Sequence, residues 1–275
     1  MLELTILKVR HSGVSEAKKL LPYIKACDVY SGETAGLTEE SARITEENWK
    51  DIHRWNLTKT AFYREIVPRF GQDRNPEMGA FTRKHAEYLF LEKKPVWCSE
   101  RLTAQEMQEE RENWQKGMHM GAAAKKLLVE DKLQEFLEAY HAQHQLLADA
   151  IKIRDKNIAK NLQTAEQYLR AEHPSLSARE PLRLTLHLGR EHFPEEHMTG
   201  PKPKIIALAP SYTSPQDQRT HELDLRIFKA CYNGTYDLEV KQDLLELAQA
   251  LLPPGRDHLA GRLREFRSSL QSNSA

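Results

Sequence analysis

The sequence has 275 residues, of which 40 are Lys or Arg and 40 are Asp or Glu, so its formal net charge is zero. A balanced chain creates no global field that would attract nucleic acid or an anionic membrane, and we expect neither as a partner. At this length, one large α/β domain with a substantial apolar core is the simplest organisation.

The cysteines and the amino-terminal residues indicate the cellular compartment of the protein. Cys27, Cys98 and Cys231 are odd in number and form no CxxC or zinc-ligand pattern, which is typical of free thiols in a reducing compartment. The start "MLELTILKVRHSG" lacks the charged and apolar regions of a signal peptide, and no stretch approaches the roughly 18 apolar residues of a spanning helix. We therefore expect a cytoplasmic protein.

Short apolar runs rich in β-branched residues are set between long charged segments. These runs predict strands at 2–9, 27–31, 95–99, 182–188 and 204–209, with a sixth in "LDLRIF" near 223. Strands that alternate with helices predict an α/β fold, with a mainly parallel or mixed central sheet flanked by helices.

Helical patterns fill the chain between these strands. We expect a helical insertion at 34–94, a helical segment at 103–172 and C-terminal helices at 238–275. Breaks are predicted near "GMHMG" at 117–121 and at "PPG", 253–255. The sequence thus predicts a single α/β domain over 1–275 with large helical insertions.

One predicted helix carries an apolar stripe that an arginine interrupts. The stripe recurs at steps of mostly three or four, which predicts a buried face: Leu147, Ile151, Ile158, Leu162, Ala165 and Leu169. Arg154 falls within this stripe. Because a guanidinium cannot be deprotonated, burying it costs on the order of several kcal/mol unless a carboxylate meets it. The sequence therefore predicts a buried carboxylate partner for Arg154.

Ionisable side chains follow four of the predicted strands. His11 follows the first, Glu33 the second, Glu100 the third and His192 the fourth. The carboxyl ends of parallel strands share one rim, where such folds bind ligands. We therefore expect these side chains to converge, with the two carboxylates as partners of Arg154. The alternative is that Glu33 and Glu100 merely cap the next helices.

The same segments carry a resemblance to a known superfamily. In chain order they are "ILKVRHSG", "DVYSGE", "KKPVWCSE", "IRDKNIAKNL", "LHLGREHF" and "KIIALAP". This series resembles the superfamily that joins erythromycin-esterase-like hydrolases, ChaN-like haem-binding proteins and TraB/Tiki proteins. Those families have a histidine motif after the first strand, a glutamate after the second, Arg-Asp on a helix before the final core strand, and Gly-x-x-His after that strand. The resemblance implies His11, Glu33, Arg154 and His192 as the polar core of a site, with Glu100 a weaker match.

The favoured function is hydrolysis of an ester or amide-like bond in a small-molecule or peptide substrate, with water as nucleophile. His11 or Glu33 would act as general base, and Arg154 would stabilise the oxyanion or hold Glu33 ionised. His192 would serve as an acid or as a metal ligand. His11, Glu33 and His192 suit a divalent transition metal, and the resemblance leaves metal dependence open because its members divide on this point.

Two alternative functions come from other classes: a haem- or iron-binding protein without turnover, and an interaction protein that has structural ion pairs only. The sequence makes no prediction of oligomeric state. No G-x-S-x-G elbow, P-loop or G-x-G-x-x-G occurs, so serine hydrolases and nucleotide-binding proteins lack their usual support.

Four further residues are candidate ligands or buried groups. His141 and His144 are spaced i, i+3, which can serve a metal, but without a third ligand we expect solvated helix histidines. His187 lies within a predicted strand and is expected to be a satisfied core histidine. Cys98, beside Trp97, is expected to be a buried thiol.

Overall fold

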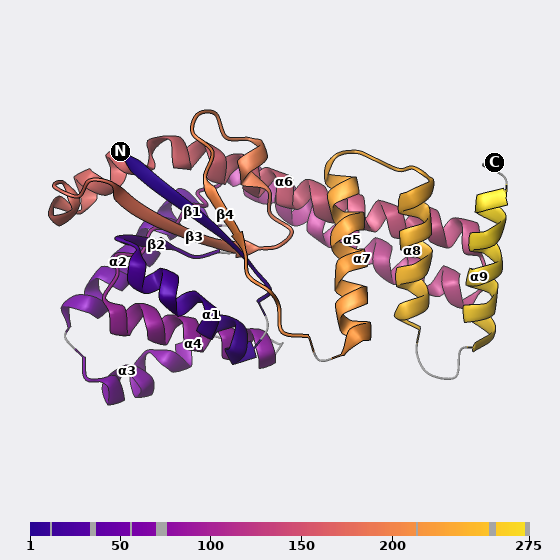
Figure 1. Ribbon diagram of the computed structural model, residues 1–275, viewed down its shortest axis with the longest axis horizontal. Coiled ribbons are helices and arrows are strands. Elements are labelled where there is room, and N and C mark those ends of the chain that lie inside the picture. The colour runs from indigo at the N-terminus through magenta and orange to yellow at the C-terminus, as the bar shows by residue number, and fades with distance from the viewer. Residues whose placement is uncertain are drawn as a thin grey trace. The chain divides into compact units, whose positions relative to one another are not determined.

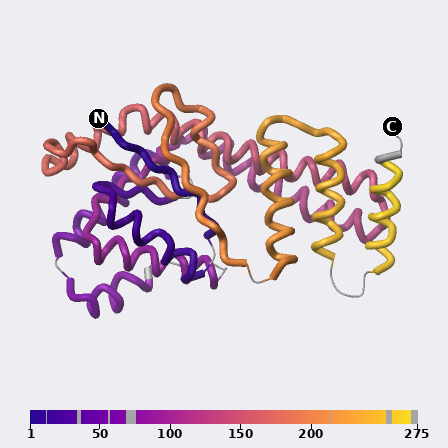
Figure 2. Tube along the Cα trace, viewed as in Figure 1, coloured from indigo at the N-terminus to yellow at the C-terminus, as the bar shows by residue number. Residues whose placement is uncertain are grey.

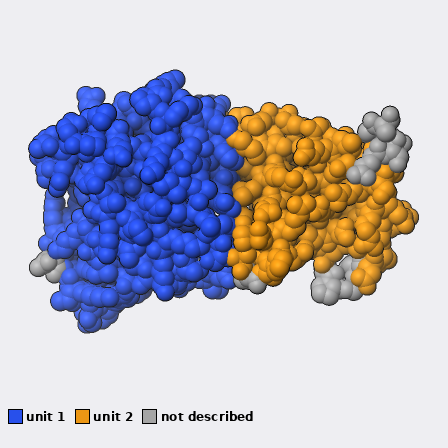
Figure 3. Space-filling model, in the orientation of Figure 1, with its two compact units in different colours: residues 1–107, 154–211 blue, residues 108–153, 212–275 orange. Residues whose placement is uncertain are grey.

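A computed structural model of the chain describes residues 1–11, 13–33, 37–55, 57–69, 76–212, 214–252 and 257–272, and the remainder is grey in Figure 2. The chain forms two compact units, coloured separately in Figure 3. Unit 1 comprises Met1–Met107 and Arg154–Ser211, and unit 2 comprises Gln108–Ile153 and Tyr212–Ala275. One domain can contain two such units, so the single-domain organisation stays a prediction.

Unit 1 is built around a four-stranded parallel sheet (Figure 1). Its strands lie in the order β2-β3-β1-β4, with bounds β1 (Leu2–Val9), β2 (Val29–Ser31), β3 (Leu182–Gly189) and β4 (Lys204–Ala207). Every pairing is parallel, so the carboxyl ends of the strands share one rim. The predicted α/β fold with a central sheet flanked by helices is confirmed.

Each face of this sheet packs on its own helices, because successive side chains of a strand point to opposite faces. On one face, Ile6 and Leu184 share a buried core with Ile158 and Leu162 of the long helix α6 (Leu133–Glu172). The residues of the predicted apolar stripe from Ile158 onward are therefore those that cover the sheet.

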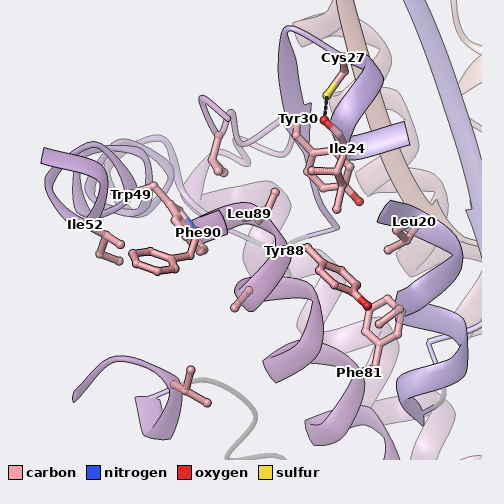
Figure 4. Packing of buried hydrophobic residues seen from close by; sticks show 14 of the residues in the cluster. Leu20, Ile24, Cys27, Tyr30, Trp49, Ile52, Phe81, Tyr88, Leu89 and Phe90 are labelled. Atoms are coloured by element: carbon pink, nitrogen blue, oxygen red, sulfur yellow. Dashed lines mark hydrogen bonds between the residues drawn. The ribbon is translucent and has the colours of Figure 1, made fainter. Parts of the chain in front are cut away.

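The other face packs on α1 (Gly13–Ala26) and α4 (Pro76–Glu92). Leu7 and Tyr30 of the sheet lie in the core with Leu20, Ile24 and Phe81. Figure 4 shows the last three together with Tyr30. The described part of the predicted insertion is helical, and besides α4 it contains α2 (Glu39–Arg54), α3 (Lys59–Glu65) and the short 3₁₀ helix η1 (Val67–Arg69).

Unit 2 contains helices only among its described residues. They are the main part of α5 (Ala104–Val129), the first part of α6, α7 (Pro215–Tyr232), α8 (Leu238–Ala250) and α9 (Asp257–Ser272). No described helix of the chain is long and apolar enough to cross a bilayer. The predicted break at 253–255 lies outside the described residues.

Two predictions about unit 2 are wrong. The expected break at 117–121 is absent, and α5 is continuous there. Its two glycines instead allow close contact with α6. A Cβ on Gly117 would lie 3.0 Å from Leu147, and one on Gly121 would lie 2.5 Å from Gln143. The strand expected near 223 is part of α7, because Leu223 and Ile227 are one helical turn apart and both are buried.

Residues 95–99, predicted as a strand, form only one parallel bridge, Tyr30 to Val96, beside β2. Pairing ends there because the backbone N–H of Cys98 donates to the carboxylate of Glu46 on α2, at 2.8 Å, instead of to a strand. The segment still carries the Glu100 loop to the rim of the sheet.

Candidate active site

Arg154 lies on α6 with only 6% of its surface exposed. Its Nε and Nη2 donate to the two carboxylate oxygens of Glu100 at 3.0 and 2.9 Å. Nη2 also donates to Oε1 of Glu33 at 3.0 Å. Burial works against charge, but the carboxylates outweigh it and raise the pKa of Arg154. The predicted carboxylate partners are confirmed, and neither glutamate lies in the first turn of a described helix.

Glu33 is the shared partner of this cluster, with 17% of its side chain exposed. Besides Arg154, its Oε1 faces Nε2 of His192 at 3.1 Å. Its Oε2 accepts the backbone N–H of Gly189 at 2.7 Å and lies 3.6 Å from Nδ1 of His11. Burial opposes ionisation, but His192, His11 and Arg154 outweigh it and hold the pKa of Glu33 well below its usual range. Glu33 is therefore a desolvated carboxylate that keeps its charge.

His192 is held from both ring nitrogens and is 1% exposed. Its Nδ1 lies 2.6 Å from Oδ1 of Asp155, the residue after Arg154, while Nε2 faces Glu33. Burial would lower the pKa of His192, but the charges of Glu33 and Asp155 raise it to about 10. His192 is therefore an imidazolium that donates twice.

An imidazolium with both nitrogens protonated has no lone pair for a metal. Among the described residues, no group of three or more His, Cys, Asp or Glu side chains is arranged to hold a metal ion. The structure therefore does not assemble the expected metal site from His11, Glu33 and His192.

A second carboxyl group lies beside Glu33. A Cβ on Gly189 would lie 2.5 Å from Oε2 of Glu191 and 3.2 Å from Oε2 of Glu33, so the two side chains converge over this glycine. Burial, with the charge of Glu33 in addition, raises the pKa of Glu191. Two neighbouring carboxyl groups with pKa values shifted in opposite directions are the pattern of an acid and its charged partner.

Histidine rings form one wall beside Glu33. The ring of His187 lies 5.3 Å from that of His11 and 4.7 Å from that of His85, and its Nδ1 is 2.8 Å from the hydroxyl of Tyr30. His187 is thus the satisfied core histidine that we predicted. Burial lowers the pKa of His85 to about 3 and that of His187 well below its usual range, so both are neutral. Nε2 of His11 and of His85 is buried with no hydrogen-bond partner among the described residues.

Helix α6 also fixes the loops that carry these groups. Asn157 accepts the backbone N–H of Arg101 at 2.7 Å and donates to its carbonyl at 3.0 Å, which holds the residue next to Glu100. Asp155 accepts the N–H of Phe193 at 2.6 Å, next to His192. One turn of helix therefore sets the position of both loops.

The remaining candidates lie outside this cluster. His144 is 4% exposed, and its ring nitrogens lie 2.9 Å from the carbonyl of Tyr140 and 3.2 Å from Asp224, so the expectation of a solvated histidine is wrong for it. The ring of His141 stacks on Tyr236 at 3.7 Å. Cys98 is buried, as predicted, and all three cysteines are free.

The sequence reasoning missed Asp155, Glu191 and His85. The sequence did carry a signal for Asp155. Positions 154 and 155 follow Ile151 by three and four residues and therefore share the buried face of the helix with Ile151 and Ile158. Glu191 precedes His192 after the strand, but only proximity to Glu33 distinguishes it from a surface acid. His85 lies on α4, away from the strand ends from which the other site residues could be predicted.

No protein-family model, curated protein or solved structure matches this chain.

Arg154→Ala should lower the free energy of unfolding by about 3–5 kcal/mol, because it leaves Glu100 and Glu33 buried without their cation. Arg154→Met should lose less, since its side chain fills the space and a carboxylate can take up a proton. Urea unfolding measures both. Lys160→Ala, on the exposed side of the same helix, is the control and should change stability by about 0.5 kcal/mol or less. A loss for Arg154→Ala no larger than for the control contradicts the burial argument.

The pKa of His192 is raised from 6.5 to about 10, so its contribution to stability is complete below pH 6.5 and is lost as pH rises toward 10. The free energy of unfolding should fall there with a slope of up to ~1.4 kcal/mol per pH unit. The lowered pKa of Glu33 acts in the opposite direction, and its contribution is lost as pH falls below 4.5. His192→Gln should flatten the alkaline limb in unfolding measured across pH. An unchanged limb would show that His192 is not the titrating group.

Proposed function

We propose that this protein hydrolyses ester or amide-like bonds, with water as the nucleophile, at the carboxyl rim of the sheet. The observation that carries the proposal is His11, whose Nδ1 faces the ionised Glu33 while its buried Nε2 has no partner among the described residues. An imidazole oriented by a carboxylate, with its other nitrogen unpaired, is the arrangement of a general base. The 3.6 Å separation is longer than a hydrogen bond, and such contacts often tighten when substrate binds.

In this mechanism Nε2 of His11 takes a proton from water as the water oxygen bonds to the carbonyl carbon. Glu33 stabilises the resulting imidazolium. Glu191, whose pKa is raised by burial, gives its proton to the leaving oxygen or nitrogen as the bond from that atom to carbon breaks. The net movement is one proton from Glu191 to His11, and exchange with solvent restores both residues.

Arg154, Glu100 and His192 are positioning residues in this proposal. Two donors of Arg154 are committed to Glu100 and Glu33, which favours the role of holding Glu33 ionised over that of stabilising the oxyanion. Both ring nitrogens of His192 face carboxylates, and its pKa is near 10. His192 therefore fits the role of a fixed positive charge better than that of an acid that must release a proton.

The substrate class follows from the surroundings of the site. The resemblance to the esterase-like superfamily supports a small-molecule or peptide substrate, and the zero formal net charge favours it over nucleic acid. Three free, buried cysteines support a cytoplasmic location.

Glu33→Gln and Glu191→Gln should each reduce turnover of aryl esters or short peptides by about 10²-fold or more. Glu33→Gln removes the charge beside His11, and Glu191→Gln removes the general acid. With a neutral Glu191 as acid, the rate should fall as pH rises through its raised pKa, and Glu191→Gln should lose that limb. Glu33→Gln combined with Glu191→Gln should cost little more than either alone, as expected for groups that act as a unit.

The matched control is Glu196→Gln, an exposed glutamate in the same loop, which should keep wild-type turnover. Assays with and without added manganese or zinc separate metal-dependent turnover from the proposed metal-free steps. Full activity in folded Glu33→Gln and Glu191→Gln proteins contradicts the proposal. Absence of turnover on every substrate leaves the ion pairs a structural role only.

Haem or iron binding without turnover is the second candidate. The observation in its favour is His85, a neutral imidazole whose buried Nε2 has no hydrogen-bond partner among the described residues, since a metal ligand must be unprotonated. Titration with haemin should then give a Soret band that His85→Ala removes. No band, or one that His85→Ala leaves unchanged, excludes this mode of binding.

A further inference from the structure

Unit 2 contains an apolar pocket that the hydrolase proposal does not use. The pocket has a volume of about 280 Å³ and lies among α5, α6, α8, α9 and the residues that follow α8. Its apolar lining includes Leu128, Phe136, Ala248 and Leu259, all buried. An apolar cavity of about 150 Å³ already binds benzene, so this one has room for a larger apolar group.

The mouth of the pocket is also apolar. Val129 and Leu251 line it and are 59% and 57% exposed, although large apolar side chains usually avoid water when they gather. A concave apolar site with exposed apolar side chains at its edge is the typical form of a ligand site. The lining thus points to an apolar ligand that enters from solvent.

One cation, Lys125, belongs to this mainly apolar lining. Lys125 is exposed and has no ion-pair partner within the described part of the chain. Its neighbour Lys126, by contrast, lies 3.9 Å from Glu130. An unpaired ammonium beside an apolar cavity complements a ligand with an apolar body and a negative head.

We infer that unit 2 binds an aliphatic carboxylate, with the alkyl chain in the pocket and the carboxylate at Lys125. Tyr140 is the other residue of the lining that has a polar side-chain atom. The site shares no residue with the hydrolase site, so each proposal can be tested independently of the other.

Titration calorimetry of the full chain with decanoate, below its micelle concentration, tests this inference. We expect saturable binding at one site. Lys125→Glu should weaken decanoate binding by about tenfold or more, because it replaces attraction by repulsion, and should change decanol binding by less than about threefold. The matched control Lys126→Glu should leave the decanoate affinity within about twofold.

Two further variants probe the cavity itself. Leu251→Glu, at an exposed position, should weaken decanoate binding more than decanol binding. Ala248→Phe should fill the pocket and remove binding of both, with circular dichroism to confirm that the variant is folded. No saturable binding, or equal effects of Lys125→Glu and Lys126→Glu, overturns the inference. Dimers in sedimentation that Leu251→Glu dissociates and decanoate does not affect would overturn it in favour of a second copy of the chain.

Discussion

A guanidinium that cannot release its proton is buried on α6 against the sheet, and the rest of the site depends on how its charge is balanced. Glu100, with no exposed surface, takes two hydrogen bonds from Arg154, and Glu33 takes a third. Removing water from charged groups costs far more than the net worth of an exposed ion pair. The loops after β2 and before α5 are therefore required to bring their carboxylates to this one point.

Glu33 then links the structural ion pairs to the chemistry. Its Oε1 serves Arg154 and His192, while its Oε2 faces His11 and the Gly189 amide. With two cations on one side, Glu33 remains charged despite burial, and its charge adds to the burial that raises the pKa of Glu191. The same ion pairs that stabilise the fold thus place a charged carboxylate next to a carboxyl group whose pKa is raised.

The residues differ in how far the sequence could predict them. The apolar runs at 2–9 and 182–188 predicted the buried strands β1 and β3, and the rule that parallel strands share a rim predicted that Glu33, Glu100 and His192 meet at Arg154. The role of Gly117 could not be predicted, because a glycine in a helix indicates a break as readily as a close approach to another helix. His85 and Glu191 gain their environment only from tertiary packing, which no local pattern in the sequence encodes.

The central claim is that the pKa values of Glu33 and Glu191, two carboxyl groups at the same rim, are shifted in opposite directions. Carbon-13 NMR of the side-chain carboxyl groups, assigned with Glu33→Gln and Glu191→Gln, measures both titrations directly. The account predicts that Glu33 titrates below its usual pKa of 4.5 and Glu191 above it. Titration of Glu33 at or above 4.5, or of Glu191 at or below it, would contradict the account.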